Sequence, residues 1–352
     1  MNQENFDFNN ENENLSAEEQ PFSAERLYEN EYYKEFIIER EKKRKVRRIA
    51  AITGGAFLAE EAFVLILNLL LSLFVTIFRS NEVVAPILFD PITENVLEII
   101  FSICAFTLPF IVVFKIGKEK ISEIVSLKKP KKENLLPLVL FGIGFCSFSN
   151  VATSVAGSFF TGLGFEYDAS FIEGPNGVVS AVLLVISVAI VPPLVEEFAL
   201  RGIVLGSMRK FGDAFAIIVS AVLFGIMHGN FEQMPFAFLT GLALGFIAVK
   251  SGSLWPAIFV HAWNNASSLF FTFGMNALSD RVQNTIYVLY LAVSMFAAVF
   301  ALTLVKNGQE FFSLEKGEED IKFSEKLKYF FLSAPIIVYV VLLFAQMFKY
   351  FV

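Results

Sequence analysis

The stretch VVSAVLLVISVAIVPPLVEEFALR, residues 178–201, decides the fold. Residues 178–195 carry no charged side chain, and roughly 18 such residues in a row are typical of a helix that crosses a membrane. Proline suits the first turn of a helix, so we expect the double proline at 192–193 to break this span and restart a helix. Glu196 and Glu197 would then lie in the first turn of the new helix, where the helix dipole favours carboxylates.

The rest of the chain is also rich in apolar residues and poor in charged ones. Of its 352 residues, 55% are hydrophobic and only 18% are charged, whereas soluble domains carry about 25% charged residues. The mean hydropathy is +0.60, and the apolar residues come in long blocks rather than alternating. The predicted fold class is therefore all-α, a polytopic transmembrane helical bundle embedded in a lipid bilayer.

We predict nine spans, separated by loops whose charge alternates. They cover approximately residues 49–78, 96–116, 134–160, 177–200, 212–228, 233–249, 253–272, 284–305 and 329–350. Lysine and arginine cluster in alternate connections, as at 42–48 and 115–132, and the opposite loops hold almost none. The positive-inside rule then places the N-terminus in the cytoplasm. We expect a multi-pass protein of the cell membrane.

The acidity of the chain belongs to its N-terminal tail. Residues 1–41 hold twelve acidic and three basic side chains, which leaves the remaining residues close to neutral. Binding to nucleic acid would need a basic face, and the sequence has none, so we expect no nucleic-acid partner.

Ionisable side chains inside the spans mark the candidate site, because each costs about 2.5–3.5 kcal/mol at membrane depth. Glu197 and Arg201 are four residues apart and can pair on one helix face. Glu196 lies about 100° round the helix and is left available for acid–base chemistry. The alternative is a double-glutamate helix end at the membrane surface. Glu60 and Glu61 also lie in an apolar block, but no proline precedes them and no arginine follows at four residues, so we assign them no catalytic role.

The chain has two histidines, and both fall in this region. His228 follows Phe224 by four residues, and Asn265 follows His261 by four, so each pair shares a helix face. A lone histidine in a membrane is often a partner in an interhelical hydrogen bond, which is the simpler interpretation of each.

Together these residues form the motifs EExxxR, FxxxH and HxxxN on successive spans. In this order the motifs resemble the CAAX-protease and bacteriocin-processing family, which includes type II CAAX prenyl endopeptidases and proteins like lysostaphin resistance protein A. The resemblance covers about 177–272 and includes a glycine-rich helix at 236–249 between the second and third motifs.

The resemblance implies an intramembrane endopeptidase acting on a membrane-associated protein or peptide, in CAAX-type or bacteriocin-related processing. The implied catalytic residues are Glu196, Glu197, His228, His261 and Asn265, with Arg201 and Phe224 as structural, orienting residues. On chemical grounds, Glu196 helped by His228 would activate water as general base. Asn265 with His261 would stabilise the oxyanion, and Glu197 with Arg201 would hold the helix.

These predictions divide the chain into four parts. They are an acidic then basic cytoplasmic tail (1–48), N-terminal spans with a basic loop (49–133), a helical core like that of CAAX proteases (134–275) and C-terminal spans (276–352).

Three alternatives use the same residues. Zinc could bind Glu196, His228 and His261 and leave a position open for water, although the expected mechanism needs no cofactor. A transporter or a non-catalytic immunity or scaffold protein would also hold polar groups at mid-membrane. Depth is a difficulty for any shared site, since His261 lies about 12 Å from the end of its predicted span, and Glu196 and His228 lie about 20–24 Å from theirs.

Overall fold

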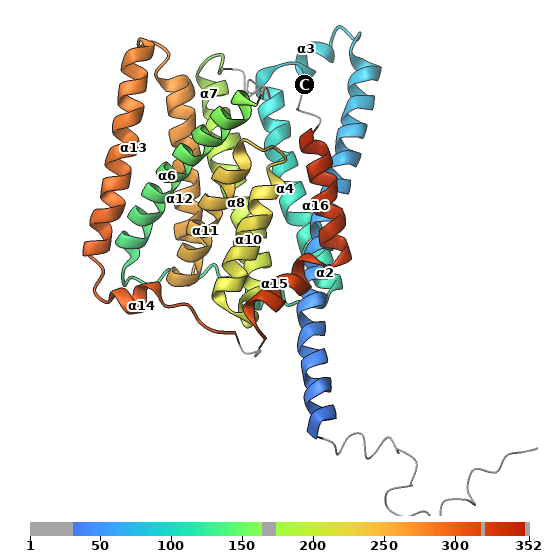
Figure 1. Cartoon of the computed structure of the whole chain (residues 1–352). Helices are drawn as coiled ribbons and strands as arrows, with labels where there is room; N and C mark the ends of the chain where they lie inside the picture. The colour runs from blue at the N-terminus through green and yellow to red at the C-terminus, as the bar shows by residue number, and fades with distance from the viewer. Residues whose placement is uncertain (1–30, 164–173, 318–320, 349–352) are drawn as a thin grey trace, which may run out of the picture. The chain divides into compact units, whose positions relative to one another are not determined.

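We analysed a computed structural model of the protein, which describes residues 31–163, 174–317 and 321–348 (Figure 1). Within these ranges the secondary structure is helical, and the single β feature is an isolated bridge between Gly212 and Lys316. The all-α prediction is confirmed. The elements are α2 (Glu31–Phe78), α3 (Ala85–Leu88), α4 (Pro91–Ile116), α5 (Ile121–Ile124), α6 (Leu135–Gly162), α7 (Val178–Leu184), the π-helix η1 (Val185–Ile190), α8 (Val191–Glu197), the π-helix η2 (Phe198–Leu205), α9 (Gly206–Met208), the 3₁₀-helix η3 (Arg209–Phe211), α10 (Asp213–Met227), α11 (Gln233–Ser251), α12 (Trp255–Leu269), the π-helix η4 (Phe270–Gly274), α13 (Asp280–Thr303), α14 (Gly308–Phe312), α15 (Phe323–Phe331) and α16 (Ala334–Met347).

Six helices in the described residues are long and apolar enough to cross a membrane, and a bent pair raises the number to seven. The protein is therefore an integral membrane protein with several spans. The predicted span 253–272 corresponds to α12 continued by η4, and the predicted span 212–228 corresponds to α10, which has 15 residues. A helix of 15 residues is about 22 Å long, shorter than the roughly 30 Å of a hydrocarbon core. The count of nine spans stays a prediction.

The last predicted span, 329–350, contains a bend. α15 ends at Phe331 and α16 begins at Ala334, and the two helices meet at 68°. Pro335 lies in the first turn of α16, where its missing N–H costs no hydrogen bond. The predicted span therefore includes a bend, and its longer apolar helix starts at Ala334.

The chain forms two units, residues Met1–Lys45 and Val46–Val352. In the first unit, the described part of α2 carries ion pairs between Lys43 and Glu39 and between Arg44 and Glu41. The second unit holds all the other helices. The finer division into four parts stays a prediction.

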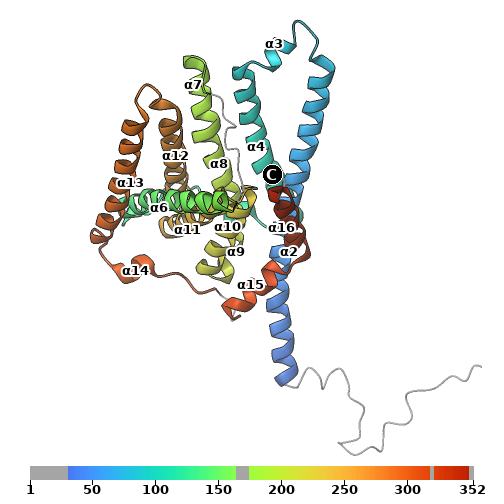
Figure 2. The same cartoon turned by 45° about the horizontal axis from the view of Figure 1, so that its top comes forward.

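The second unit is held together by close helix packing around α10, α11 and α6 (Figures 1 and 2). α10 lies against α11, α11 lies against α6, and α13 runs beside α6 at one edge. Gly241 allows the approach of α11 to α10, because a Cβ there would lie 3.0 Å from the Cα of Ala221. At the other edge, the ring of Phe57 packs 5.1 Å from Phe110 and 4.7 Å from Tyr339, joining α2, α4 and α16.

Basic residues that we predicted on one side of the membrane do lie together. Glu119 accepts a hydrogen bond from Arg48 at 2.9 Å and lies 3.6 Å from the Nζ of Lys210. These residues come from α2, the connection after α4, and η3. The shared ion-pair network is consistent with one polar face, and the cytoplasmic placement of that face stays a prediction.

We predict that Gly144→Ala destabilises the protein through the α6–α13 contact. A Cβ at Gly144 would lie 2.5 Å from the backbone oxygen of Ser294 and 2.4 Å from the Cβ of Ala298, so α13 would have to move. Overpacking of this kind costs about 1–3 kcal/mol. Thermal unfolding in detergent should show a lower midpoint.

The matched control is Gly162→Ala at the end of the same helix, where an added Cβ meets nothing within 4 Å. We expect the midpoint of this variant to stay level or rise slightly, since alanine favours a helix by about 0.5–1 kcal/mol over glycine. Equal midpoints for the two variants would show that α6 and α13 do not approach as closely as described.

Candidate active site

The glutamate motif lies inside one continuous helical segment of 34 residues, Val178–Phe211. The predicted break at the double proline is therefore wrong. The hydrogen-bond register changes instead, from the π-helix η1 to α8 and then to the π-helix η2. The prolines occupy the start of α8, as expected, but Glu196 and Glu197 are its last two residues, and its first turn holds no acidic residue. The dipole at a helix start therefore does not stabilise these two carboxylates, and their burial and side-chain partners must do so instead.

The double proline leaves a backbone carbonyl without its helical donor. Pro192 and Pro193 have no N–H, and these are the two positions from which an α- or π-helical bond to the carbonyl of Val188 would come. The side chain of Asn265 supplies the missing bond, because its Nδ2 donates to that carbonyl at 3.0 Å. The last residue of the HxxxN motif thus ties α12 to η1.

Arg201 lies at the centre of the site, with its side chain 0% exposed. Its Nη1 donates to Glu197 Oε1 at 2.8 Å, which confirms the predicted pair. Its Nη2 donates to the carbonyl of Gly241 at 3.3 Å, and its guanidinium lies 4.2 Å from the ring centroid of Phe224. The one cation therefore contacts α8, α10 and α11.

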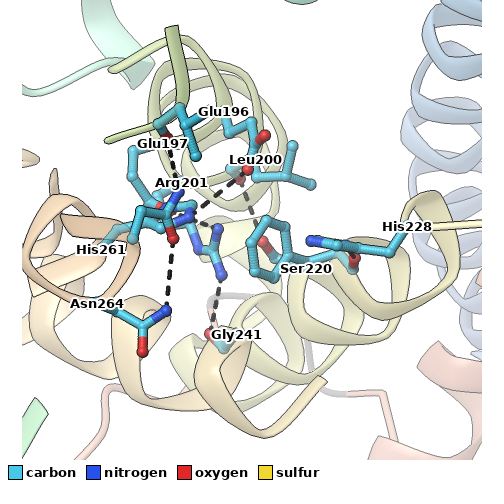
Figure 3. Close-up of polar contacts among 12 residues, drawn as sticks. Glu196, Glu197, Leu200, Arg201, Ser220, His228, Gly241, His261 and Asn264 are labelled. Atoms are coloured by element: carbon cyan, nitrogen blue, oxygen red, sulfur yellow. Dashed lines mark hydrogen bonds and ion pairs between the residues drawn. The ribbon is translucent and has the colours of Figure 1, made fainter. Parts of the chain in front are cut away.

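The histidine of α12 meets both glutamates (Figure 3). The Nδ1 of His261 lies 2.9 Å from Glu197 Oε1, and its Nε2 lies 3.8 Å from Glu196 Oε2. A carboxylate that is already paired with Arg201 can only accept from Nδ1, so Nδ1 carries the proton and Nε2 faces Glu196. The difference in membrane depth between His261 and Glu196 that we calculated along their predicted spans does not keep these two side chains apart.

His228 and His261 both pack against the ring of Phe224. The ring of Phe224 meets His228 edge to face at 4.9 Å and His261 at 5.6 Å. The Nδ1 of His228 donates to the carbonyl of Phe224 at 2.7 Å, which leaves Nε2 as its free nitrogen. In the described residues, the histidine that lies opposite Glu196 is His261, at 3.8 Å. The predicted help of His228 to Glu196 in activating water stays a prediction.

The structure adds two asparagines that we did not predict. Asn264 donates to Asn265 Oδ1 at 3.4 Å, and Asn150 of α6 donates to Asn264 Oδ1 at 3.4 Å. Asn264 was within reach of sequence reasoning, because it follows His261 by three residues and so lies near the same helix face. Asn150 was not, since nothing in the sequence pairs α6 with α12.

The predicted zinc set does not come together as a ligand group. In the part of the chain that the structure describes, no group of three or more His, Cys, Asp or Glu side chains could hold a metal ion. As they lie, these side chains do not form a zinc site, and zinc stays a prediction from the sequence.

The second glutamate pair, on α2, has different surroundings. Glu61 accepts a hydrogen bond from Gln346 at 3.4 Å. Glu60 lines a cavity of about 520 Å³ between α2 and α4, together with Glu94 and Glu98. Neither resembles Glu196, which has a histidine opposite it.

We predict that Arg201→Ala and Glu197→Ala each lower the folded yield and thermal stability. Each removes half of a buried ion pair and strands the other charge, at a cost of about 3–5 kcal/mol. Size-exclusion profiles and thermal unfolding of the purified variants would measure the loss.

The matched control is Lys120→Ala. Lys120 also pairs with an acidic residue one helical turn on, with Nζ 2.8 Å from Glu123 Oε1, but both side chains are exposed, at 74% and 65%. Such pairs contribute about 0–1 kcal/mol, so this variant should fold normally. Normal stability of all three variants would contradict the burial of Arg201.

Comparison with known proteins agrees with this site. A sequence model of the family "Type II CAAX prenyl endopeptidase Rce1-like" matches residues 178–267, which include all seven predicted site residues. A protein of Bacillus subtilis (strain 168) named "Putative membrane peptidase YdiL" is 26% identical over 200 residues, covering 53% of this chain and 80% of that protein. No solved structure matches. Residues 178–267, which hold the three motifs, are therefore similar to the Rce1-like family of type II CAAX prenyl endopeptidases and to a named putative membrane peptidase.

Proposed function

We propose that the protein is an intramembrane endopeptidase in which Glu196 activates the attacking water. The observation that carries this proposal is the chain of contacts from Arg201 to Glu197, from Glu197 to His261, and from His261 to Glu196. In this chain of contacts, Arg201 neutralises Glu197, and Glu196 faces the Nε2 of His261. A site that distinguishes two neighbouring carboxylates in this way suits acid–base chemistry.

The reaction would begin with a water held between Glu196 and His261. Their facing atoms, Oε2 and Nε2, are 3.8 Å apart, too far for a direct hydrogen bond, and a water can bridge groups beyond that range. Glu196 takes a proton as the water oxygen attacks the peptide carbonyl carbon. The tetrahedral intermediate then collapses, the C–N bond breaks, and the proton on Glu196 passes to the leaving nitrogen.

Glu197 and Arg201 would act as positioning residues. The carboxylate of Glu197 fixes the tautomer of His261, as a carboxylate does for a catalytic or metal-bound histidine in other enzymes. Arg201 neutralises Glu197 and holds it in place. Phe224 would help to orient both histidine rings, because its own ring packs edge to face against each of them.

The oxyanion would be stabilised by N–H donors at the site edge. Asn265 Nδ2 has two N–H groups and uses one for Val188, so the other remains to donate to the developing charge. The substrate class that fits a site of this kind is a membrane-associated protein or peptide, in CAAX-type or bacteriocin-related processing. The proposed setting is the cell membrane with a cytoplasmic N-terminus.

We predict that Glu196→Gln keeps the fold and abolishes cleavage, because an amide cannot accept the proton. General-base catalysis contributes about 10²–10⁴-fold. The test is a trapping screen that identifies membrane proteins held by the Glu196→Gln variant and compares their cleaved ends with those made by the wild type.

The matched control is Glu61→Gln, the same substitution at a glutamate on α2 whose carboxylate is bonded to Gln346. This variant should cleave like the wild type. Retained cleavage by Glu196→Gln at normal expression would remove Glu196 from the mechanism, and loss in both variants would point to a general effect of polarity in the bundle.

A further prediction concerns zinc. Because no group of three or more His, Cys, Asp or Glu side chains in the described residues could hold a metal ion, we expect chelators to leave cleavage unchanged and the purified protein to contain no stoichiometric zinc. Stoichiometric zinc whose removal stops cleavage would replace this mechanism with one in which Glu196, His228 and His261 bind the metal.

A further inference from the structure

A second polar cavity lies along α12, beyond the proposed catalytic residues. It has a volume of about 270 Å³ and is walled by α6, α12, η4 and α13. The residues that matter below are Asn150, Asn264, Ser268, Thr272, Asn284 and Tyr287. The cavity touches the site through Asn264, whose amide bonds to Asn265.

The lining of this cavity is polar without being ionic. Amides and hydroxyls line it, together with Phe271 and Met275, and the described lining includes no Asp, Glu, Lys, Arg or His. A charged group entering from the membrane would find no counter-ion there, which is costly in an apolar setting. An uncharged occupant with its own donors and acceptors would match the lining.

Several of these polar groups lack a protein partner. The side chains of Ser268, Thr272, Asn284 and Tyr287 make no hydrogen bond to other described residues, whereas Tyr290 in the same wall donates to Ser267 at 3.0 Å. Ser268, Thr272 and Asn284 are exposed, so their hydrogen-bonding groups are open to an occupant of the cavity. Four unused groups around one cavity suit a ligand that hydrogen-bonds.

The cavity lies along the helical segment that carries His261. Ser268 and Thr272 lie seven and eleven residues beyond His261 on the segment formed by α12 and η4, about 10 and 16 Å along a helix. About three to five residues of extended peptide cover that distance. A peptide unwound for cleavage also has free N–H and C=O groups, which amides and hydroxyls can satisfy.

We propose that this cavity is a substrate subsite, which holds an uncharged stretch with amide or hydroxyl side chains next to the cleaved bond of a membrane-inserted peptide. The proposal rests on the proposed function for the identity of the occupant. It narrows the substrate class, because a charged segment at this position would be rejected.

The experiment uses the full chain in lipid nanodiscs and fluorescent Leu/Ala peptides of about 20 residues, long enough to span a bilayer. Three peptides differ in one segment, Asn-Ser-Thr, Leu-Ala-Val or Lys-Asp-Lys. Binding is measured on the wild type and on Glu196→Gln, and cleavage on the wild type. We expect both proteins to bind the Asn-Ser-Thr peptide about tenfold more tightly than the other two, as several hydrogen bonds imply.

The variants Thr272→Val and Asn284→Leu remove polar groups of the cavity. Each should weaken binding of the Asn-Ser-Thr peptide by roughly two- to twelvefold, the value of one net hydrogen bond. The matched control is Thr285→Val on α13. Its hydroxyl bonds to its own helix at Arg281, and it does not line the cavity, so binding should not change.

Each outcome decides the matter. Equal binding of the three peptides, or binding that is insensitive to Thr272→Val and Asn284→Leu, overturns the subsite. Unchanged binding with slower cleavage in those variants also overturns it, in favour of a path for water. Selective binding that depends on Thr272 and Asn284 without any cleavage supports the subsite and counts against the proposed hydrolysis. Cleavage that ignores both residues supports the hydrolysis and overturns the subsite.

Discussion

A guanidinium enclosed in a membrane bundle constrains everything around it. Arg201 is fully buried and cannot lose its proton, so the surrounding helices must supply an anion and acceptors. Glu197 provides the charge, the carbonyl of Gly241 provides a second acceptor, and the ring of Phe224 covers the remaining face. The absence of a side chain at Gly241 lets its backbone come this close. The positions of α8, α10 and α11 therefore depend on a single cation.

The double proline leaves a backbone carbonyl without a donor, and a side chain of α12 supplies one. Without N–H groups at Pro192 and Pro193, the carbonyl of Val188 has no helical donor, and Asn265 donates to it. The same helix carries His261 to Glu197 four residues earlier. The spacing of the HxxxN motif thus serves two attachments at once, one to an ion pair and one to a carbonyl, and both orient α12 against the glutamate helix.

Local spacing explains what the sequence could predict. The Glu197–Arg201 pair and the shared faces of Phe224 with His228 and of His261 with Asn265 depend on positions within one helix, so the motifs were sufficient. The partner of Glu196 depends on how three helices meet around the Phe224 ring, and the sequence does not encode that simply. The expected break at the prolines was wrong because the helix continues through a change from π- to α-helical register, while Asn265 supplies the donor that Val188 lacks. The number of spans could not be predicted either, because some helices, such as α10 with 15 residues, are close to the shortest length that crosses a bilayer.

The two neighbouring glutamates show why a buried ion pair can serve a proposed catalytic site. Adjacent residues of a helix point about 100° apart, so only one of them can face Arg201. Oε1 of Glu197 accepts from both Arg201 and His261, and its charge is thereby neutralised and fixed. Glu196 receives no such cation and keeps its carboxylate, 14% exposed, opposite the free nitrogen of His261. The Glu197–Arg201 ion pair fixes the packing of the helices around it. Because this pair neutralises Glu197 and not Glu196, Glu196 is left to take a proton in the proposed mechanism.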